Sequence, residues 1–487
     1  MKKLLALPVF MLALCVSAQK PVFKYALETE PKTSPDVLVM AHPSGTKTAF
    51  LLKNKKKIEY LLTGSDFKVI SSFVNAQEPD KTIYNTMAIP AGYIYNGQKL
   101  YNFIYDENSR GGKTSPGRDA LLMDVIDFTG KQSELAVKHT YEPGEKVVNA
   151  FTYGNTYYTL SVPASGDALS VCYIDSTLNK TVRSYPLSIS QLISGYNTLV
   201  NLFRKASVVY PDRENDLEAV TAAVKIMPQA GGKIVISSDQ KGLPTILAVI
   251  DLYNNRLSLK QPEMNELCIT DDKNASVNST VLGNFMFTTV ACKQKLELAV
   301  YDYNTGKLIK KHESGKDESA PAVALGGLNA ETFSDGRKKN EKSLDNTGGL
   351  LKAMWNGNCG VRLSAATQNL VLTVGAYKGG KETAFPGIIR PEEAAPDYVA
   401  PFHYTNYGPQ LKFTGDYSTA WFRTVLTGDK FEKVKLSLKP GPADKLRDAL
   451  SMEDKLPPAV PVFVMGGITY YPWYDAEAQQ FTIRAVK

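Results

Sequence analysis

The sequence is poor in the residues and motifs on which most enzymes rely. It has only four histidines among 487 residues. No Gly-x-Ser-x-Gly, His-Glu-x-x-His or Cys-x-x-Cys motif occurs, so a hydrolase nucleophile elbow and the common zinc sites have no sequence support. The stretch Ser109 to Thr114 ends in Gly-Lys-Thr, but Glu107 stands where a phosphate-binding loop needs glycine. We expect no cofactor and no metal. Whether the protein is an enzyme stays open, with a non-enzyme favoured.

Arginine is also scarce. The 56 basic residues comprise 44 lysines and 12 arginines, and the formal net charge is +7. Lysine is a solvated point charge, whereas arginine binds phosphate through a planar fork. The composition therefore indicates a soluble surface rather than a nucleic-acid groove, and we expect no nucleic-acid partner.

Long apolar runs are missing except at the N-terminus. Lys2 and Lys3 precede the apolar run Leu4–Val16, and Val16-Ser17-Ala18 fits a cleavage site. The run is shorter than the ~20 residues of a membrane span, and Leu14 before Cys15 does not fit a lipoprotein signal. We therefore predict a signal peptide over residues 1–18. The mature chain is expected to be periplasmic, extracellular or at the cell surface, without a transmembrane segment.

Four cysteines remain after that cleavage: Cys172, Cys268, Cys292 and Cys359. Export permits disulfides, but four thiols in a chain of this length do not form a stapled scaffold. Cys172 and Cys292 lie in strand-like patterns, where cysteine packs as a small apolar residue. The disulfide state stays open.

The most regular stretch present is Leu298–Lys311, which has the pattern of a β-hairpin. An alternating strand ends at Asp302, Asn304-Thr305-Gly306 supplies the turn, and Lys307 begins a return strand. Similar units recur, with Asn96-Gly97 between aromatic strands as the strongest hairpin signal. The chain is thus expected to consist of many short antiparallel strands.

An aspartate recurs at the end of a strand in four of these units. Asp127, Asp175, Asp251 and Asp302 are separated by 48, 76 and 51 residues, and about 50 residues make one four-stranded blade. Each aspartate is expected to hydrogen-bond its own turn.

Three segments interrupt the β pattern. Residues at about 188–225 have helical spacing, with Ser188 as a candidate cap, and predict a helical insertion between blades. Residues at about 313–349 are polar and charged, and those at about 379–410 are rich in proline and aromatics. We interpret both as irregular loops.

With its export signal, repeated strand–Asp–turn–Lys unit and helical insertions, the chain resembles large secreted bacterial β-propeller proteins without an assigned activity. The resemblance implies an all-β fold in which residues 19–487 form one propeller. We expect six to eight four-stranded blades, with seven as the best estimate. Pairing of the last strand with the first blade would close the ring and remove open edges.

The segment 379–410 is the one candidate binding region. Its candidate ligand-binding residues are Tyr398, Phe402, His403, Tyr404 and Tyr407, because aromatics and prolines make a rigid contact surface. Alternatively, these side chains pack beneath their own loop.

The favoured function is a non-catalytic binding or scaffold protein that engages a protein or glycan through a propeller face. The alternative is an extracellular hydrolase or lyase acting on polysaccharide or peptide from the central funnel. The ligand and the oligomeric state stay open.

Overall fold

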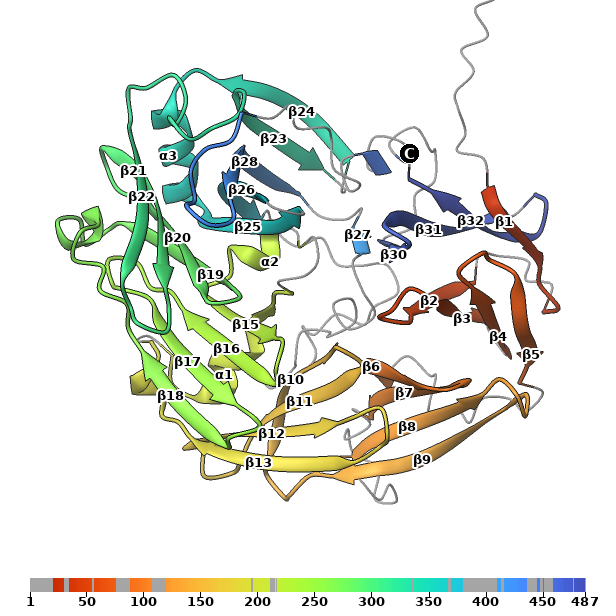
Figure 1. Cartoon of the computed structure of the whole chain (residues 1–487). Coiled ribbons are helices and arrows are strands. Elements are labelled where there is room, and N and C mark those ends of the chain that lie inside the picture. Colours follow the sequence, from red (N-terminus) through yellow and green to blue (C-terminus); the bar gives the residue numbers. More distant parts are fainter. Residues whose placement is uncertain are drawn as a thin grey trace, which may run out of the picture.

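Seven mainly antiparallel sheets stand around a common axis (Figure 1). The computed structural model describes residues 21–29, 35–54, 57–75, 88–106, 120–193, 196–210, 215, 217–334, 337–366, 369–379, 410–412, 416–435, 445–446, 450, 459–475 and 477–486. Most of the sheets have four strands. The predicted all-β propeller is confirmed, and so is the estimate of seven blades.

Blades 1 to 3 follow one another along the chain, each with its strands in sequential order. Blade 1 comprises β2 (Asp36–Ala41), β3 (Lys47–Asn54), β4 (Lys57–Gly64) and β5 (Val69–Val74). Blade 2 comprises β6 (Ala88–Asn96), β7 (Lys99–Asp106), β8 (Ala120–Asp127) and β9 (Gln132–Thr140). Blade 3 comprises β10 (Lys146–Tyr153), β11 (Thr156–Val162), β12 (Ala168–Ile174) and β13 (Lys180–Pro186). The hairpin turns use left-handed backbone at Gly97 (φ 60°) and at Gly154 and Asn155 (φ 56° and 59°). Such turns match the twist of the strands that they join.

The predicted insertion at about 188–225 contains short helical segments between blades 3 and 4. These are a 3₁₀ turn (Ile189–Gln191), α1 (Leu199–Arg204) and α2 (Leu217–Val220). Ser188 precedes the 3₁₀ turn, but α1 is capped by Thr198, whose side chain accepts from Asn201 N–H. Leu199, Leu202 and Phe203 of α1 are buried. The helices are therefore shorter than the helical spacing of the sequence predicted. Their apolar residues pack against the propeller.

Blade 4 has five strands and blade 5 has four. Blade 4 consists of β14 (Ser207–Val208), β15 (Val224–Gln229), β16 (Lys233–Ser238), β17 (Ile246–Asp251) and β18 (Arg256–Lys260); blade 5 consists of β19 (Ser276–Leu282), β20 (Phe285–Ala291), β21 (Lys295–Asp302) and β22 (Leu308–Gly315). A disulfide links Cys268, in a 3₁₀ turn between these blades, to Cys292, just after β20. The disulfide state, which the sequence left open, is thus decided for Cys292, because the connection between the blades brings Cys268 against the end of β20. Cys172 and Cys359 are buried and free.

Blade 6 corrects the prediction for residues 313–349. Its strands, in spatial order, are β24 (Arg337–Leu344), β23 (Leu328–Ser334), β28 (Tyr417–Thr427), β26 (Asn369–Gly379) and β25 (Asn358–Ala366), and α3 (Thr347–Asn356) leads into β25. The segment predicted as an irregular loop therefore contains the β23–β24 hairpin. Lys338 pairs with Glu331 across this hairpin at 3.2 Å. An outer edge strand tolerates many lysines because it is solvated and unpaired on one side, so it lacks the apolar alternation that marks inner strands.

Blade 7 closes the ring. It consists of β30 (Phe463–Met465), β31 (Ile468–Asp475), β32 (Gln480–Ala485) and β1 (Pro21–Ala26). The first strand of the chain thus pairs with the last, as in Tyr25↔Phe481. The expected closure is confirmed, with β1 serving as the outer strand of the last blade. A separate two-stranded sheet consists of β27 (Gln410–Lys412) and β29 (Ala459–Pro461).

The apolar core lies between neighbouring blades, not inside any one sheet. Buried residues of blades 3 and 4 form one cluster, and those of blades 4 and 5 another. Inner strands are therefore covered on both faces, and all six residues of β15 are buried. Within the described residues, no helix has the length and apolarity needed to cross a membrane.

Candidate functional site

The antiparallel order of each blade brings two of its turns to one face of the ring. The turn between the first and second strands and the turn between the third and fourth lie at the same edge, because alternate strands run in the same direction. We call the face that carries these turns the turn face, and the opposite face the loop face. Most connections on the turn face are short and lie within the described residues.

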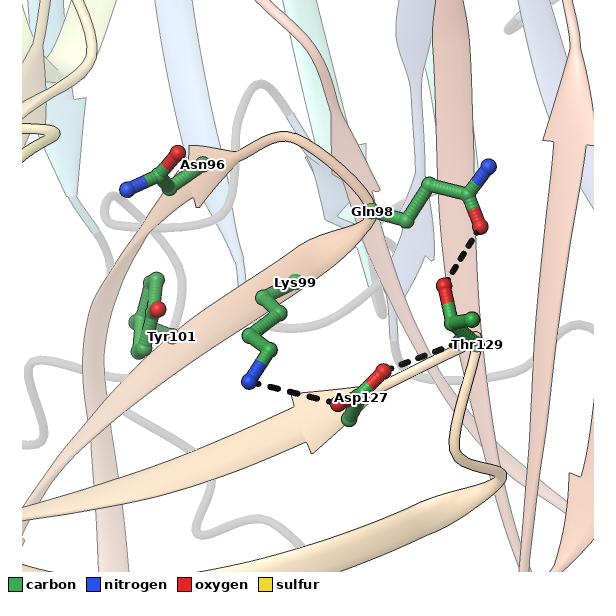
Figure 2. A pocket seen from close by; sticks show the side chains of 6 residues that line it. All are labelled: Asn96, Gln98, Lys99, Tyr101, Asp127 and Thr129. Carbon is green, nitrogen blue, oxygen red and sulfur yellow. Dashed lines mark hydrogen bonds and ion pairs between the residues drawn. The ribbon is translucent and has the colours of Figure 1, made fainter.

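A depression of about 590 Å³ lies on the turn face of blade 2 (Figure 2). It is lined by Asn96, Gln98, Lys99, Tyr101, Asp127 and Thr129. These residues come from the β6–β7 turn, the start of β7 and the β8–β9 turn. Regular hairpins thus position every side chain in the lining.

The two charges in this depression compensate each other. Lys99 Nζ lies 3.2 Å from Asp127 Oδ2. Asp127 Oδ1 accepts hydrogen bonds from the backbone N–H groups of Thr129 and Gly130, each at 2.9 Å. The bond from Gly130, with help from Thr129 and Lys99, holds the pKa of this carboxyl below its usual value. Asp127 is therefore a fixed anion that completes its turn, which makes it a poor general base.

The remaining polar groups of the lining are neutral. The Thr129 hydroxyl donates to Gln98 Oε1 at 2.8 Å, and Figure 2 shows the amide nitrogen of Gln98 pointing away from Thr129. Asn96 and Tyr101 stand on the other side of Lys99 in the same view. Amide and hydroxyl groups both donate and accept hydrogen bonds, so the depression suits an uncharged polar ligand.

Neighbouring blades fix the turns that carry this site. Asn155, in the β10–β11 turn, accepts from Tyr95 N–H at 2.8 Å and donates to the Tyr95 carbonyl at 2.9 Å. Lys47 of blade 1 donates to the Gly97 carbonyl, and its ammonium lies 5.1 Å from the centre of the Tyr95 ring. A site held this way loses little conformational entropy when it binds a ligand.

The four repeated aspartates are confirmed as turn residues. Besides Asp127, Asp175 accepts from the backbone N–H of Thr177 at 2.8 Å, and Asp251 accepts from that of Asn254 at 2.9 Å. Asp302 accepts from the N–H of Asn304 at 2.8 Å. Their shared role is structural, as the sequence predicted.

The five predicted ligand-binding residues, Tyr398, Phe402, His403, Tyr404 and Tyr407, lie outside the described residues, so they stay a prediction. A second depression, of about 410 Å³, lies on the loop face of blade 6, beside Gly379 and Asp416. Next to it, Phe333 stacks on Tyr417 with ring centres 4.3 Å apart. The described residues that flank the predicted segment thus include an aromatic pair.

The three described histidines serve local packing. His42 Nδ1 is 2.7 Å from the hydroxyl of Ser44, within one turn, and His312 Nε2 is 2.9 Å from the Phe431 carbonyl. His139 packs edge-on against Tyr141. Burial lowers the pKa of all three imidazoles. The described part of the chain holds no group of three His, Cys, Asp or Glu residues that could bind a metal.

No motif in the sequence marks a buried ion pair within blade 4, between the start of β15 and the residue that follows β16. Lys225 Nζ lies 2.6 Å from Asp239 Oδ2, and the two side chains are 0% and 1% exposed. Thr245 donates its hydroxyl to Asp239 at 2.6 Å, and Ser279 donates its N–H at 3.1 Å. No substrate reaches a pair sealed in this way, so we assign it a structural role.

Comparisons with known proteins found similarity among solved structures only. No protein family and no curated protein sequence matches the chain. Among solved structures, the Dos1 propeller is 10% identical, with a TM-score of 0.27 over 84% of this chain and 95% of that chain. The Nup133 β-propeller domain of Vanderwaltozyma polyspora is 8% identical, with a TM-score of 0.27 over 80% and 83%. A Synechocystis ACO mutant is 9% identical, with a TM-score of 0.27 over 57% of this chain and 62% of that chain, less than two thirds of that chain's length. At these scores, the assignment to β-propeller proteins rests on the sheet topology of the chain itself.

Proposed function

We propose that this protein is an exported, non-catalytic binding protein that holds a protein or glycan ligand against the turn face of its propeller. The observation that carries the proposal is the depression on blade 2, with its paired Lys99–Asp127 charges and neutral Gln98 and Thr129 groups. Sites of this kind orient a ligand by hydrogen bonds on a preformed surface.

The chemistry of the lining favours binding over catalysis. Asp127 is committed to Lys99 and to its own turn, and the other lining groups are amides, a hydroxyl and a phenol. None of these is an activated nucleophile or a base with a raised pKa. On the described residues, no observation favours the hydrolase or lyase alternative.

Two features support export. One is the predicted signal peptide, residues 1–18, which lies outside the described residues. The Cys268–Cys292 disulfide is of a kind that persists in oxidising compartments.

In the test, residues 19–487 of the chain are applied to a glycan array and, separately, to extracellular proteins of the source organism. The key variant combines Gln98→Ala and Thr129→Ala. Its matched control combines Asn284→Ala and Asn304→Ala, which remove the corresponding side-chain hydrogen bond of blade 5 (3.3 Å). We expect the key variant to bind its ligand about tenfold more weakly, because two neutral hydrogen bonds contribute that much. The control should bind like the unchanged protein.

A third variant separates the two candidate faces. It carries alanine at Tyr398, Phe402, His403, Tyr404 and Tyr407. Ligand binding that this variant loses and the blade 2 variant keeps would contradict the turn-face proposal and favour the predicted segment instead.

A further inference from the structure

Strand register identifies equivalent turn positions in blades 2, 4 and 5. Lys99 pairs with Asp127, Lys233 pairs with Asp251, and Phe285 pairs with Asp302. In each blade, one residue directly precedes the first member of this pair, and another follows the aspartate by two positions. These two residues face each other across the two turns. These facing pairs are Gln98 and Thr129, Gly232 and Tyr253, and Asn284 and Asn304.

Blade 4 differs from the other two in this facing pair. In blades 2 and 5 the pair is polar and hydrogen-bonded, at 2.8 Å and 3.3 Å. In blade 4 the Tyr253 ring lies on Gly232, and a Cβ at Gly232 would lie only 2.8 Å from Tyr253 Cε2. The small residue and the large one are complementary, because only glycine leaves room for the ring at this distance.

Tyr253 is not required by the turn or by the core. The turn is completed by Asp251, which accepts from Asn254 N–H as its counterparts do in the other blades. The residue that seals the core here is Leu252, which is 2% exposed, whereas Tyr253 is 73% exposed. An aromatic ring held rigidly on a backbone and open to solvent has the properties of a binding platform.

Blade 3 carries two further tyrosines where it packs against blade 4. Tyr158 and Tyr173, on β11 and β12, have ring centres 6.2 Å apart. Tyr158 is buried in the same apolar cluster as Leu252, the residue before Tyr253, and Tyr173 packs against that cluster. Burial raises the pKa of Tyr158 to about 12, so its hydroxyl stays protonated and able to donate at physiological pH. The exposed Tyr253 ring thus follows a residue that packs with two further tyrosines at the junction of two blades.

We propose that Tyr253, with Tyr158 and Tyr173, forms a subsite for one ring of a neutral glycan. The C–H face of a sugar ring stacks on the electron-rich face of Tyr253, and the sugar hydroxyls bond to the neighbouring phenols. A neutral sugar fits because the carboxylate of Asp251, two residues before Tyr253, is already engaged by its own turn. The inference rests on the proposed function of the turn face and names the ligand class.

The experiment measures binding of cellohexaose, maltohexaose, xylohexaose and mannohexaose to residues 19–487 by isothermal titration calorimetry. At least one hexaose is expected to bind. Tyr253→Thr places in blade 4 the residue that blade 2 carries as Thr129, so the fold is kept, and we expect binding to weaken about tenfold or more. Tyr253→Phe keeps the ring and should bind within about threefold of the unchanged protein, because it loses only one neutral hydrogen bond. Asn304→Ala, at the equivalent position of blade 5, should have no effect.

Three results would overturn the subsite. One is unchanged binding by Tyr253→Thr, with its folding verified by circular dichroism. Another is equal losses in Tyr253→Thr and Asn304→Ala. The third is no binding of any of the four hexaoses to the unchanged protein. In that last case, a protein ligand that still requires Gln98 and Thr129 would leave the proposed function standing while the glycan inference fails.

Discussion

Two of the lysine–aspartate pairs in the described residues lie in opposite surroundings. Lys99 and Asp127, on the turn face of blade 2, are 48% and 18% exposed, whereas Lys225 and Asp239 are 0% and 1% exposed. The exposed pair is screened by water, and either partner can be hydrated alone. The buried pair has no such alternative, so each charge depends on the other and on Thr245 and Ser279. The same two types of side chain therefore tune a surface in one place and, in the other, join two strands of blade 4 inside the core, where the Ser279 N–H of blade 5 also binds Asp239.

The largest effect should come from breaking the buried pair. Asp239→Ala leaves the Lys225 ammonium buried without its counter-ion, and we expect the free energy of unfolding to fall by about 3–5 kcal/mol. Urea denaturation followed by circular dichroism measures this loss. Replacing both residues with apolar ones, Lys225→Met with Asp239→Leu, should recover much of it. If the single variant lost no more than an exposed pair does, the contrast between the two pairs would not hold.

Glu297 offers an intermediate case. This carboxylate is buried but pairs with a partly exposed lysine, Lys295, at 3.0 Å. It also accepts from the Cys268 N–H at 2.7 Å. Glu297→Ala strands that N–H, and we expect a loss of roughly 1–3 kcal/mol in unfolding free energy.

The matched control for Glu297 is Glu313→Ala. Glu313 contacts the same lysine, Lys295, at 3.2 Å, but its side chain is 44% exposed. Its removal should change the urea midpoint much less. Equal losses in the two variants would mean that the charge contact, and not burial of the carboxylate, sets the stability here.

The turn aspartates should produce a stability change in acid. Hydrogen bonds from turn groups lower the pKa values of Asp127 and Asp251 in the folded protein. The unfolded carboxyls titrate near their ordinary pKa of about 3.9. Their contribution is therefore complete above that value and is lost as the pH falls through the lower folded pKa. The urea midpoint should drop below about pH 4, and less so in Asp251→Asn; an identical acid profile in that variant would contradict the assignment.

The smallest effect is expected from the exposed pair. Lys99→Met removes the partner of Asp127 but leaves its backbone hydrogen bonds from Thr129 and Gly130. The urea midpoint should stay within experimental error, because exposed pairs contribute little. A shift as large as that of Glu297→Ala would show that the depression on blade 2 is far less solvated than its exposure indicates.

Local features of the fold were accessible from the sequence. The hairpins at Asn96-Gly97 and Gly154-Asn155 were predicted because glycine and asparagine favour left-handed backbone, which Gly97, Gly154 and Asn155 adopt. The aspartate turns were predicted because an aspartate bonds to backbone only two or three residues away. The hairpin within 313–349 was missed, because a lysine-rich edge strand such as β24 shows no alternation to detect.

The sites were less accessible than the strands. Proline and aromatic content drew attention to residues 379–410, whereas the described depression of blade 2 is built from ordinary turn residues that no motif marks. The Gly232–Tyr253 contact becomes visible only when the register of blade 4 is set beside those of blades 2 and 5.

By itself, the sequence determined that this chain makes a ring of β-sheets with aspartate-capped turns, because those signals lie within a few residues of each other. Tertiary structure alone decided which distant groups meet: Cys268 with Cys292, the Asp239 carboxylate with the Ser279 N–H, and Leu252, next to Tyr253, with the tyrosines of blade 3. These contacts depend on how one blade packs against the next. Apolar residues on the faces of every blade drive that packing. Because these residues are alike in all blades, the sequence does not indicate which distant groups the packing brings into contact.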